Sequence, residues 1–174
     1  MLILGIDPGY AIVGYGVVEF SNSRYRPLEY GAVTTKAGTS FDSRLEKIYD
    51  SITEILARHK PDAMAIEKLF FQNNQKTVIG VAEARGVILL AAIKAGVKIY
   101  EYTPLQVKMA VTGYGRATKP QMQEMTRRLL NLKEVPKPDD TADALAMAIC
   151  YGQAAGSALK RRIFQPNTAG LKPI

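Results

Sequence analysis

The sequence is poor in the residues that most often carry zinc or nucleophilic chemistry: its 174 residues include one cysteine, one histidine and no tryptophan. Cys150, expected in the core, has no partner for an internal disulfide, and a chain without disulfides fits the reducing cytosol, so we expect a cytoplasmic protein. His59 follows an amphipathic pattern and is expected at a helix end. One histidine without an evident partner excludes a Cys/His zinc site and a serine or cysteine triad. Any catalysis must therefore depend on carboxylates, lysines or hydroxyls.

Long apolar runs are also missing. No run approaches the roughly 20 residues of a membrane span, and no signal peptide is recognisable. Acidic residues are outnumbered, because 23 Lys and Arg stand against 16 Asp and Glu, which gives a formal net charge of +7. A basic domain of this size often binds a polyanion, although ribosomal and membrane-surface proteins share such an excess.

The hydrophobic pattern predicts an α/β domain. Strands are expected over residues 2–6, 14–20, 28–34, 63–66 and 97–100, and helices over 45–56, 75–95, 104–113, 118–130 and 139–151. The order β-β-β-α-β-α-β-α-α-α predicts a five-stranded mixed sheet, a three-stranded antiparallel meander plus two parallel strands, with helices on both faces. We expect one domain over residues 1–156 and a basic, loosely ordered tail over 157–174.

Four acidic residues stand at places where carboxylates would converge. Asp7 and Glu67 each end an apolar strand, and Asp140 and Asp143 are three residues apart on the last helix, so they share a face. Ends of neighbouring parallel strands meet at one edge of a sheet, and a helix that begins there would bring the four acids together. Carboxylate oxygens without Cys or His select Mg²⁺ or Mn²⁺, and a pair of such ions promotes phosphodiester cleavage.

Each acid also has an ordinary structural interpretation. Asp7 precedes a Pro-Gly pair and could shape a turn, Glu67 could be a solvated strand end, and Asp143 could lie on an exposed helix face. Asp139 or Asp140 could cap the last helix, and we assign the N-cap to Asp139. The joint pattern of the acids, more than any single one, favours a metal site.

Basic residues precede the acidic helix. Lys108, Arg116 and Lys119 lie on or between two predicted helices and suit contacts with a phosphate backbone. Lys119 also stands near a helix start, where anions bind well. Arg127 and Arg128 fit a solvated helix face equally well.

Two further features concern partners. Phe70 and Phe71 open a polar loop after Glu67, where one ring could pack in the core and an exposed ring could stack on an unpaired base. The predicted helix is apolar nearly all round over residues 81–93, yet a sheet covers only one side. We therefore expect a twofold homodimer to cover the other side.

Four short motifs follow one another over residues 1–152: Gly5-Ile6-Asp7-Pro8-Gly9, Ala65-Ile66-Glu67 with Phe70, Gln106-Val107-Lys108, and Asp140-Thr141-Ala142-Asp143-Ala144-Leu145-Ala146. In order and spacing they resemble the signatures of the RuvC family of crossover-junction endodeoxyribonucleases. The resemblance implies an RNase H-like fold, a homodimer, and paired symmetric nicks at four-way (Holliday) DNA junctions in recombination and repair. It also implies RuvA and RuvB, the branch-migration proteins, as partners.

The resemblance also assigns roles to residues. It makes Asp7, Glu67, Asp140 and Asp143 the catalytic ligands of two Mg²⁺ ions, for which Mn²⁺ substitutes. By the same resemblance, the DNA contacts include two lysines and an aromatic at the crossover: Lys108, Lys119 and Phe70. Because Phe71 doubles the aromatic, which ring stacks stays open, and so does the part played by Asp139 beside the last acidic pair.

Two other classes of protein need comparison. An actin-like ATPase also opens with an apolar strand and an acid-glycine turn, but it would need a second domain and nucleotide loops. A DNA-binding module without enzymatic activity would have the basic face but would not need four convergent acids.

Overall fold

The computed structural model describes residues 1–68 and 75–156. In chain order the elements are β1 (Leu2–Asp7), β2 (Ile12–Ser21), β3 (Arg24–Thr34), α1 (Phe41–His59), β4 (Ala63–Glu67), α2 (Gln75–Lys94), β5 (Lys98–Tyr102), α3 (Pro104–Thr112), α4 (Lys119–Leu129) and α5 (Asp139–Gly156). The predicted order is confirmed, although α5 extends beyond its predicted end. Phe70, Phe71 and the predicted tail over 157–174 lie outside the described residues.

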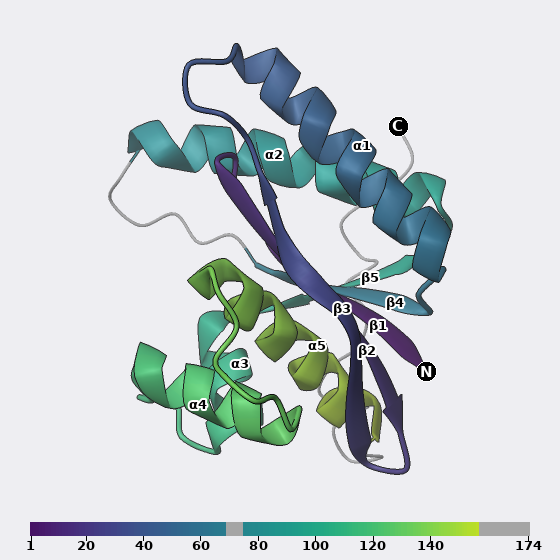
Figure 1. Cartoon of the computed structure of the whole chain (residues 1–174), viewed down its shortest axis with the longest axis vertical. Coiled ribbons are helices and arrows are strands. Elements are labelled where there is room, and N and C mark those ends of the chain that lie inside the picture. The colour runs from purple at the N-terminus through teal and green to yellow at the C-terminus, as the bar shows by residue number, and fades with distance from the viewer. Residues whose placement is uncertain (69–74, 157–174) are drawn as a thin grey trace.

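The strands form one mixed sheet in the order β3-β2-β1-β4-β5 (Figure 1). β1 pairs antiparallel with β2 and β2 with β3, whereas β4 runs parallel to both β1 and β5. The predicted meander plus two parallel strands is therefore confirmed. Because β1, β4 and β5 point the same way, their carboxyl ends meet at one edge of the sheet.

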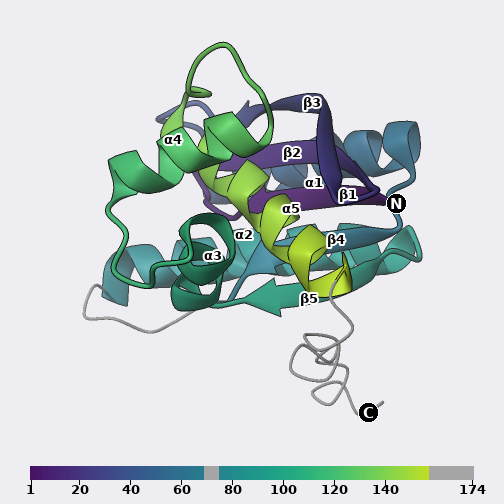
Figure 2. The ribbon, with the colours of Figure 1, turned by 90° about the horizontal axis from the view of Figure 1, so that it is seen from below.

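Helices cover both faces of the sheet, as predicted (Figures 1 and 2). α1 and α2 pack on one face, where Leu4 and Ile6 of β1 join Ile48 of α1 and Ile88 of α2 in a buried cluster. On the opposite face α3, α4 and α5 enclose a second core, which includes Ile3 of β1. The central strand β1 carries no charged residue before Asp7, its last residue, because both of its faces are buried.

Helix α5 lies directly on β1 and β2 because glycines leave it room. A Cβ added at Gly5 would come 2.0 Å from the main-chain oxygen of Ala144, and one added at Gly14 would come 1.9 Å from that of Asp140. Only glycine permits so close an approach of helix to strand. The contact at Gly14 places the first turn of α5 beside the end of β1.

Two predictions about single residues are confirmed. His59 is the last residue of α1, and its Nε2 lies 2.7 Å from Glu29 Oε2 on β3. Cys150 is buried within α5. Among the described helices, none combines the length and the apolar character needed to cross a bilayer.

Candidate active site at the carboxyl ends of β1 and β4

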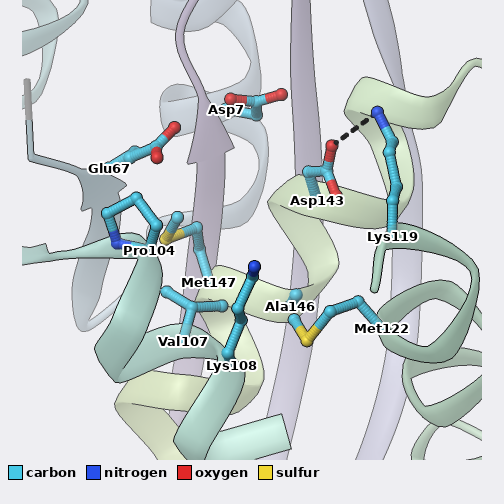
Figure 3. A pocket seen from close by; sticks show the side chains of 10 residues that line it. All are labelled: Asp7, Glu67, Pro104, Val107, Lys108, Lys119, Met122, Asp143, Ala146 and Met147. Atoms are coloured by element: carbon cyan, nitrogen blue, oxygen red, sulfur yellow. Dashed lines mark ion pairs between the residues drawn. The ribbon is translucent and has the colours of Figure 1, made fainter. Parts of the chain in front are cut away.

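A pocket of about 230 Å³ opens where β1, β4, α3, α4 and α5 meet (Figure 3). Three of the four predicted acids and two of the predicted basic residues line it. The lining residues are Asp7, Glu67, Pro104, Val107, Lys108, Lys119, Met122, Asp143, Ala146 and Met147. The apolar members form the wall from α3, α4 and α5, so the charged groups sit against a surface of low polarity.

The acids reach the pocket from three elements. Asp7 is the last residue of β1 and Glu67 the last of β4, and the parallel register pairs the residues just before them, Ile6 with Ile66. Asp143 comes from the second turn of α5, which the close contact with β1 and β2 holds over the strand ends. Figure 3 shows the three carboxylates directed toward a common space.

Burial and mutual crowding of these acids raise their pKa values. Burial, followed by the charges of Asp143, Glu67 and Asp140, raises the pKa of Asp7 to about 8. Burial and the charge of Asp143 raise the pKa of Glu67. Burial also raises the pKa of Asp143, and Lys119 acts against that rise. The pocket therefore favours a proton or a cation over a bare set of carboxylates.

Lys119 supplies positive charge at the rim of the pocket. Its Nζ lies 3.2 Å from Asp139 Oδ2 and 3.3 Å from Asp143 Oδ2. Lys119 opens α4, where Thr118 is the N-cap in a capping box with Gln121. The helix start thus fixes the lysine beside the acidic helix.

Asp139 and Asp140 differ from expectation. The assignment of Asp139 as N-cap is wrong, because α5 begins at Asp139 itself. Its carboxylate faces α4 instead, where the contact with Lys119 lowers its pKa. Asp140 is outside the set that lines the pocket, and it acts on the site through its charge, which helps raise the pKa of Asp7 and of Asp143.

The predicted basic residues divide into two groups. Lys108, half-buried on α3, lines the pocket together with Lys119. Arg116 is exposed between α3 and α4 and does not line it. Arg127 and Arg128 both bind Glu124 on their own helix, as expected of a solvated helix face.

Sequence reasoning missed an arginine behind the site. Arg85 of α2 donates from Nε to the main-chain oxygen of Glu67, 3.3 Å away, and its guanidinium forms an ion pair with Glu101 of β5. Nothing local in the sequence indicated this contact. Asp139 and Asp143, which both contact Lys119, are four residues apart, so the sequence does indicate that they share a helix face.

Across residues 1–68 and 75–156, no three acidic, histidine or cysteine side chains are gathered closely enough in this conformation to hold a metal ion. Asp143 directs a carboxylate oxygen at Lys119 instead (Figure 3). The three acids thus share one pocket without closing around a single point, and Lys119 supplies their counter-charge.

Fold and site together define a nuclease of the RNase H-like class: a mixed five-stranded sheet with acids at the ends of its central parallel strands. Residues 3–151 match the family model of crossover junction endodeoxyribonuclease RuvC, and the chain belongs to that family. It is accordingly an enzyme that hydrolyses phosphodiester bonds of DNA. This membership excludes both alternatives, the actin-like ATPase and the non-enzymatic binding module.

Individual relatives agree in sequence and structure. The crossover junction endodeoxyribonuclease RuvC of Caldanaerobacter subterraneus subsp. tengcongensis is 56% identical over 151 residues, which cover 87% of this chain and 92% of the relative. The structure of Thermus thermophilus RuvC has a TM-score of 0.84 and 38% identity, covering 90% of this chain and 96% of that one. T. thermophilus RuvC in complex with a Holliday junction substrate gives a TM-score of 0.82 and 36% identity over the same shares of both chains.

Proposed function

We propose that this endonuclease resolves four-way DNA junctions by paired symmetric nicks during homologous recombination and repair. The observation that carries the proposal is the pocket itself, where Asp7, Glu67 and Asp143 point into one space beside Lys108 and Lys119. The Thermus thermophilus relative, solved with a Holliday junction, supports this choice of substrate. By the same family resemblance we propose action in the cytoplasm alongside the branch-migration proteins RuvA and RuvB.

The donor chemistry of the pocket fits a hard divalent cation. Its acidic groups are carboxylates, and the raised pKa values of Asp7, Glu67 and Asp143 reflect their burial first and the charge of neighbouring acids second, both of which a bound cation would offset. We assign two Mg²⁺ ions, replaceable by Mn²⁺, to these three acids and Asp140. Such ions, when bound, supply an activated water and offset the charge that develops on the leaving oxygen.

The lysines have a different task, which is to hold the strand. Lys108 lines the pocket from α3, and Lys119 stands at the start of α4, where main-chain amides also favour an anion. We propose that Lys119 releases Asp143 when a cation binds and turns to a DNA phosphate. Exposed Arg116 would continue the phosphate contacts outside the pocket.

The aromatic pair after Glu67 is assigned to recognition. Phosphate contacts are available on any duplex, so they cannot select a junction. We propose that Phe70 stacks on a base unpaired at the crossover, and that Phe71 packs inside. Base–aromatic stacking contributes roughly 1–3 kcal/mol, so Phe70→Ala should lower junction cleavage about tenfold or more and leave duplex affinity unchanged. Phe71→Ala should mainly lower the melting temperature, and normal nicking by both variants would exclude an aromatic wedge.

A homodimer would supply two such sites. α2 exposes Ile79, Leu90 and Ile93, with relative exposures of 63%, 48% and 53%, and exposed Glu83 and Gly86 lie between them. The spacing of four and three residues keeps this stripe on one side of the helix. We propose that the stripe packs against the partner's copy, because a junction offers two equivalent strands to cut.

Cleavage of a labelled four-way junction tests the proposed function. With Mg²⁺ the wild type should produce symmetric nicks, whereas Asp7→Asn and Glu67→Gln should lose cleavage by orders of magnitude. Both variants should keep their affinity for the junction in EDTA, because the acids repel phosphate until ions bind. Glu54→Gln, an exposed acid on α1, is the matched control and should cleave normally. Near wild-type cleavage by either pocket variant would exclude the assigned site.

A further inference from the structure

Arg85 joins three elements behind the pocket. From α2 it donates through Nε to the main-chain oxygen of Glu67, 3.3 Å away at the end of β4, and it forms an ion pair with Glu101 of β5. The two side chains are only 12% and 25% exposed, so water screens the pair less than it does a surface ion pair. One planar guanidinium therefore meets two acceptors on neighbouring strands.

The end of β4 needs such a contact. The parallel ladder between β1 and β4 stops at Ile6 and Ile66, one residue before Glu67. On the β5 side the ladder continues through the amide of Lys68, which donates to the oxygen of Tyr102 at 2.8 Å. The main-chain oxygen of Glu67 accepts a hydrogen bond from the Arg85 side chain, so this arginine adds a contact where the pairing of β4 with β1 stops.

A contact that only fastened α2 to the sheet would not need both acceptors. The ion pair with Glu101 alone would link the helix to β5, and an ammonium group would serve equally well. The additional bond reaches the main chain of the residue whose carboxylate points into the pocket. A lysine has no fork of donors with which to hold both acceptors in a fixed geometry.

We propose that Arg85 is a positioning residue for the cleavage reaction, anchored by Glu101, and that it holds the end of β4 so that the Glu67 carboxylate stays directed into the pocket. The inference rests on the proposed role of Glu67. Loss of the two contacts of Arg85 should loosen the position of the Glu67 carboxylate without removing it. Cation binding and turnover should then suffer, while contacts between DNA and the lysines persist.

Arg85→Lys and Glu101→Gln test the proposal against Arg58→Lys, which alters an ion pair of α1 with Glu29 on β3, outside the pocket. Three quantities are measured for each folded variant: kcat and KM for junction nicking, the Mg²⁺ concentration that gives half of the maximal rise in melting temperature, and junction affinity in EDTA. We expect Arg85→Lys to lower kcat about tenfold or more and to raise the Mg²⁺ midpoint at least several-fold. KM and affinity in EDTA should stay within about twofold, and Arg58→Lys should match the wild type throughout.

The outcomes separate positioning from stability. A lower melting temperature with an unchanged Mg²⁺ midpoint and unchanged kcat would show that Arg85 only fastens α2, and would overturn the proposal. If Arg85→Lys fails to fold, Glu101→Gln decides, with a smaller change in the same direction expected and no change overturning it. The double variant should be no worse than Arg85→Lys alone, because the two residues act as one unit.

Glu67→Gln, measured in parallel, distinguishes the two levels of inference. Wild-type nicking by Glu67→Gln would remove the proposed function of Glu67, and the role of Arg85 with it. An inactive Glu67→Gln beside a normal Arg85→Lys would overturn the positioning role alone.

Discussion

Lys119 Nζ lies 3.3 Å from Asp143 Oδ2, so the chain places one of its own cations against the acidic pocket. The Lys119 side chain is 53% exposed and that of Asp143 35%, and water therefore weakens their attraction. A divalent ion, with twice the charge, can displace such a partner. The pair offsets part of the repulsion among the acids of the pocket.

Lys119→Met should expose the repulsion that the lysine offsets. We expect the melting temperature without metal to fall by a few degrees at most, in keeping with the ~1 kcal/mol or less of exposed ion pairs. The rise caused by Mg²⁺ should become larger than in the wild type, because the cluster carries more uncompensated negative charge. Thermal melting in EDTA and in a series of MgCl₂ concentrations measures both effects.

Arg26→Met is the control for that experiment, because it removes an ion pair with Glu19 on the exposed surface of β2 and β3. Its response to Mg²⁺ should equal that of the wild type. Equal Mg²⁺ responses in the wild type and Lys119→Met would show that the lysine does not compete with a cation.

Asp7 should make the metal-free protein lose stability as the pH rises. The ordinary pKa of the carboxyl is 3.8, which applies to the unfolded chain, and the folded pKa is about 8. Between these values the folded state keeps a proton that the unfolded state has released, so unfolding becomes easier with rising pH. Asp7→Asn removes this effect and should melt above the wild type in EDTA, by a margin that grows from about pH 4 to about pH 8.

Melting curves across that window decide the point. Asp42→Asn is the control, because hydrogen bonds lower the pKa of this exposed carboxyl below its ordinary 3.8. Its contribution is therefore lost only below about pH 4, and its gap to the wild type should stay constant across the window. A gap between Asp7→Asn and the wild type that stays constant from pH 4 to pH 8 would contradict the raised pKa. Mg²⁺ should reverse the order of the two proteins at pH 8, because only the wild type keeps the full ligand set.

Local signals explain why much of the fold could be predicted from the sequence. Asp7 and Glu67 each follow an apolar run that is buried on both faces of the sheet, which made both strand ends visible. The starts of α3 and α4 were marked by Thr103 and Thr118, and both residues form capping boxes. Such signals depend on neighbours within a few residues along the chain.

The rest depends on how elements pack. Asp139 looked like a cap because it precedes an apolar helix, but the approach of α4 gives its carboxylate a partner in Lys119. Arg85 looked like one charge on an apolar helix, and only the position of α2 over β4 and β5 reveals its contact with Glu67. Neither relationship has a spacing that a single sequence could show.

Gly14 and Gly5 should tolerate no side chain. The added Cβ would lie within 2.0 Å of main-chain oxygens of α5, which cannot rotate away as a side chain can. Overpacking of this kind costs about 1–3 kcal/mol or more, so Gly5→Ala and Gly14→Ala should both lower the midpoint of urea unfolding clearly. Gly14→Ala should also reduce junction cleavage per folded molecule, because the added Cβ displaces the main chain of Asp140, whose charge acts on Asp7. Unfolding midpoints equal to the wild type would show that α5 lies farther from the sheet.

Leu90→Glu should separate the proposed dimer. A charge at the centre of the exposed stripe of α2 cannot be buried against a second copy without a large desolvation cost. The monomer itself should remain folded, because Leu90 is already 48% exposed. Sedimentation should therefore give the mass of one chain for Leu90→Glu and of two for the wild type, and nicks at the two strands of a junction should lose their pairing.

Leu28→Glu provides the matched control, since Leu28 is 42% exposed on β3, away from the stripe. It should stay dimeric and cleave normally.

Gly86→Ala extends the test, because a Cβ at Gly86 would meet nothing within 4 Å in the single chain and alanine favours a helix by about 1 kcal/mol. In the single chain, Gly86→Ala should therefore stabilise α2. If a partner helix packs closely against Gly86, the added methyl group should instead weaken the association of the two chains. Equal masses for Leu90→Glu and the wild type, with unchanged association of Gly86→Ala, would place the dimer surface elsewhere on the molecule.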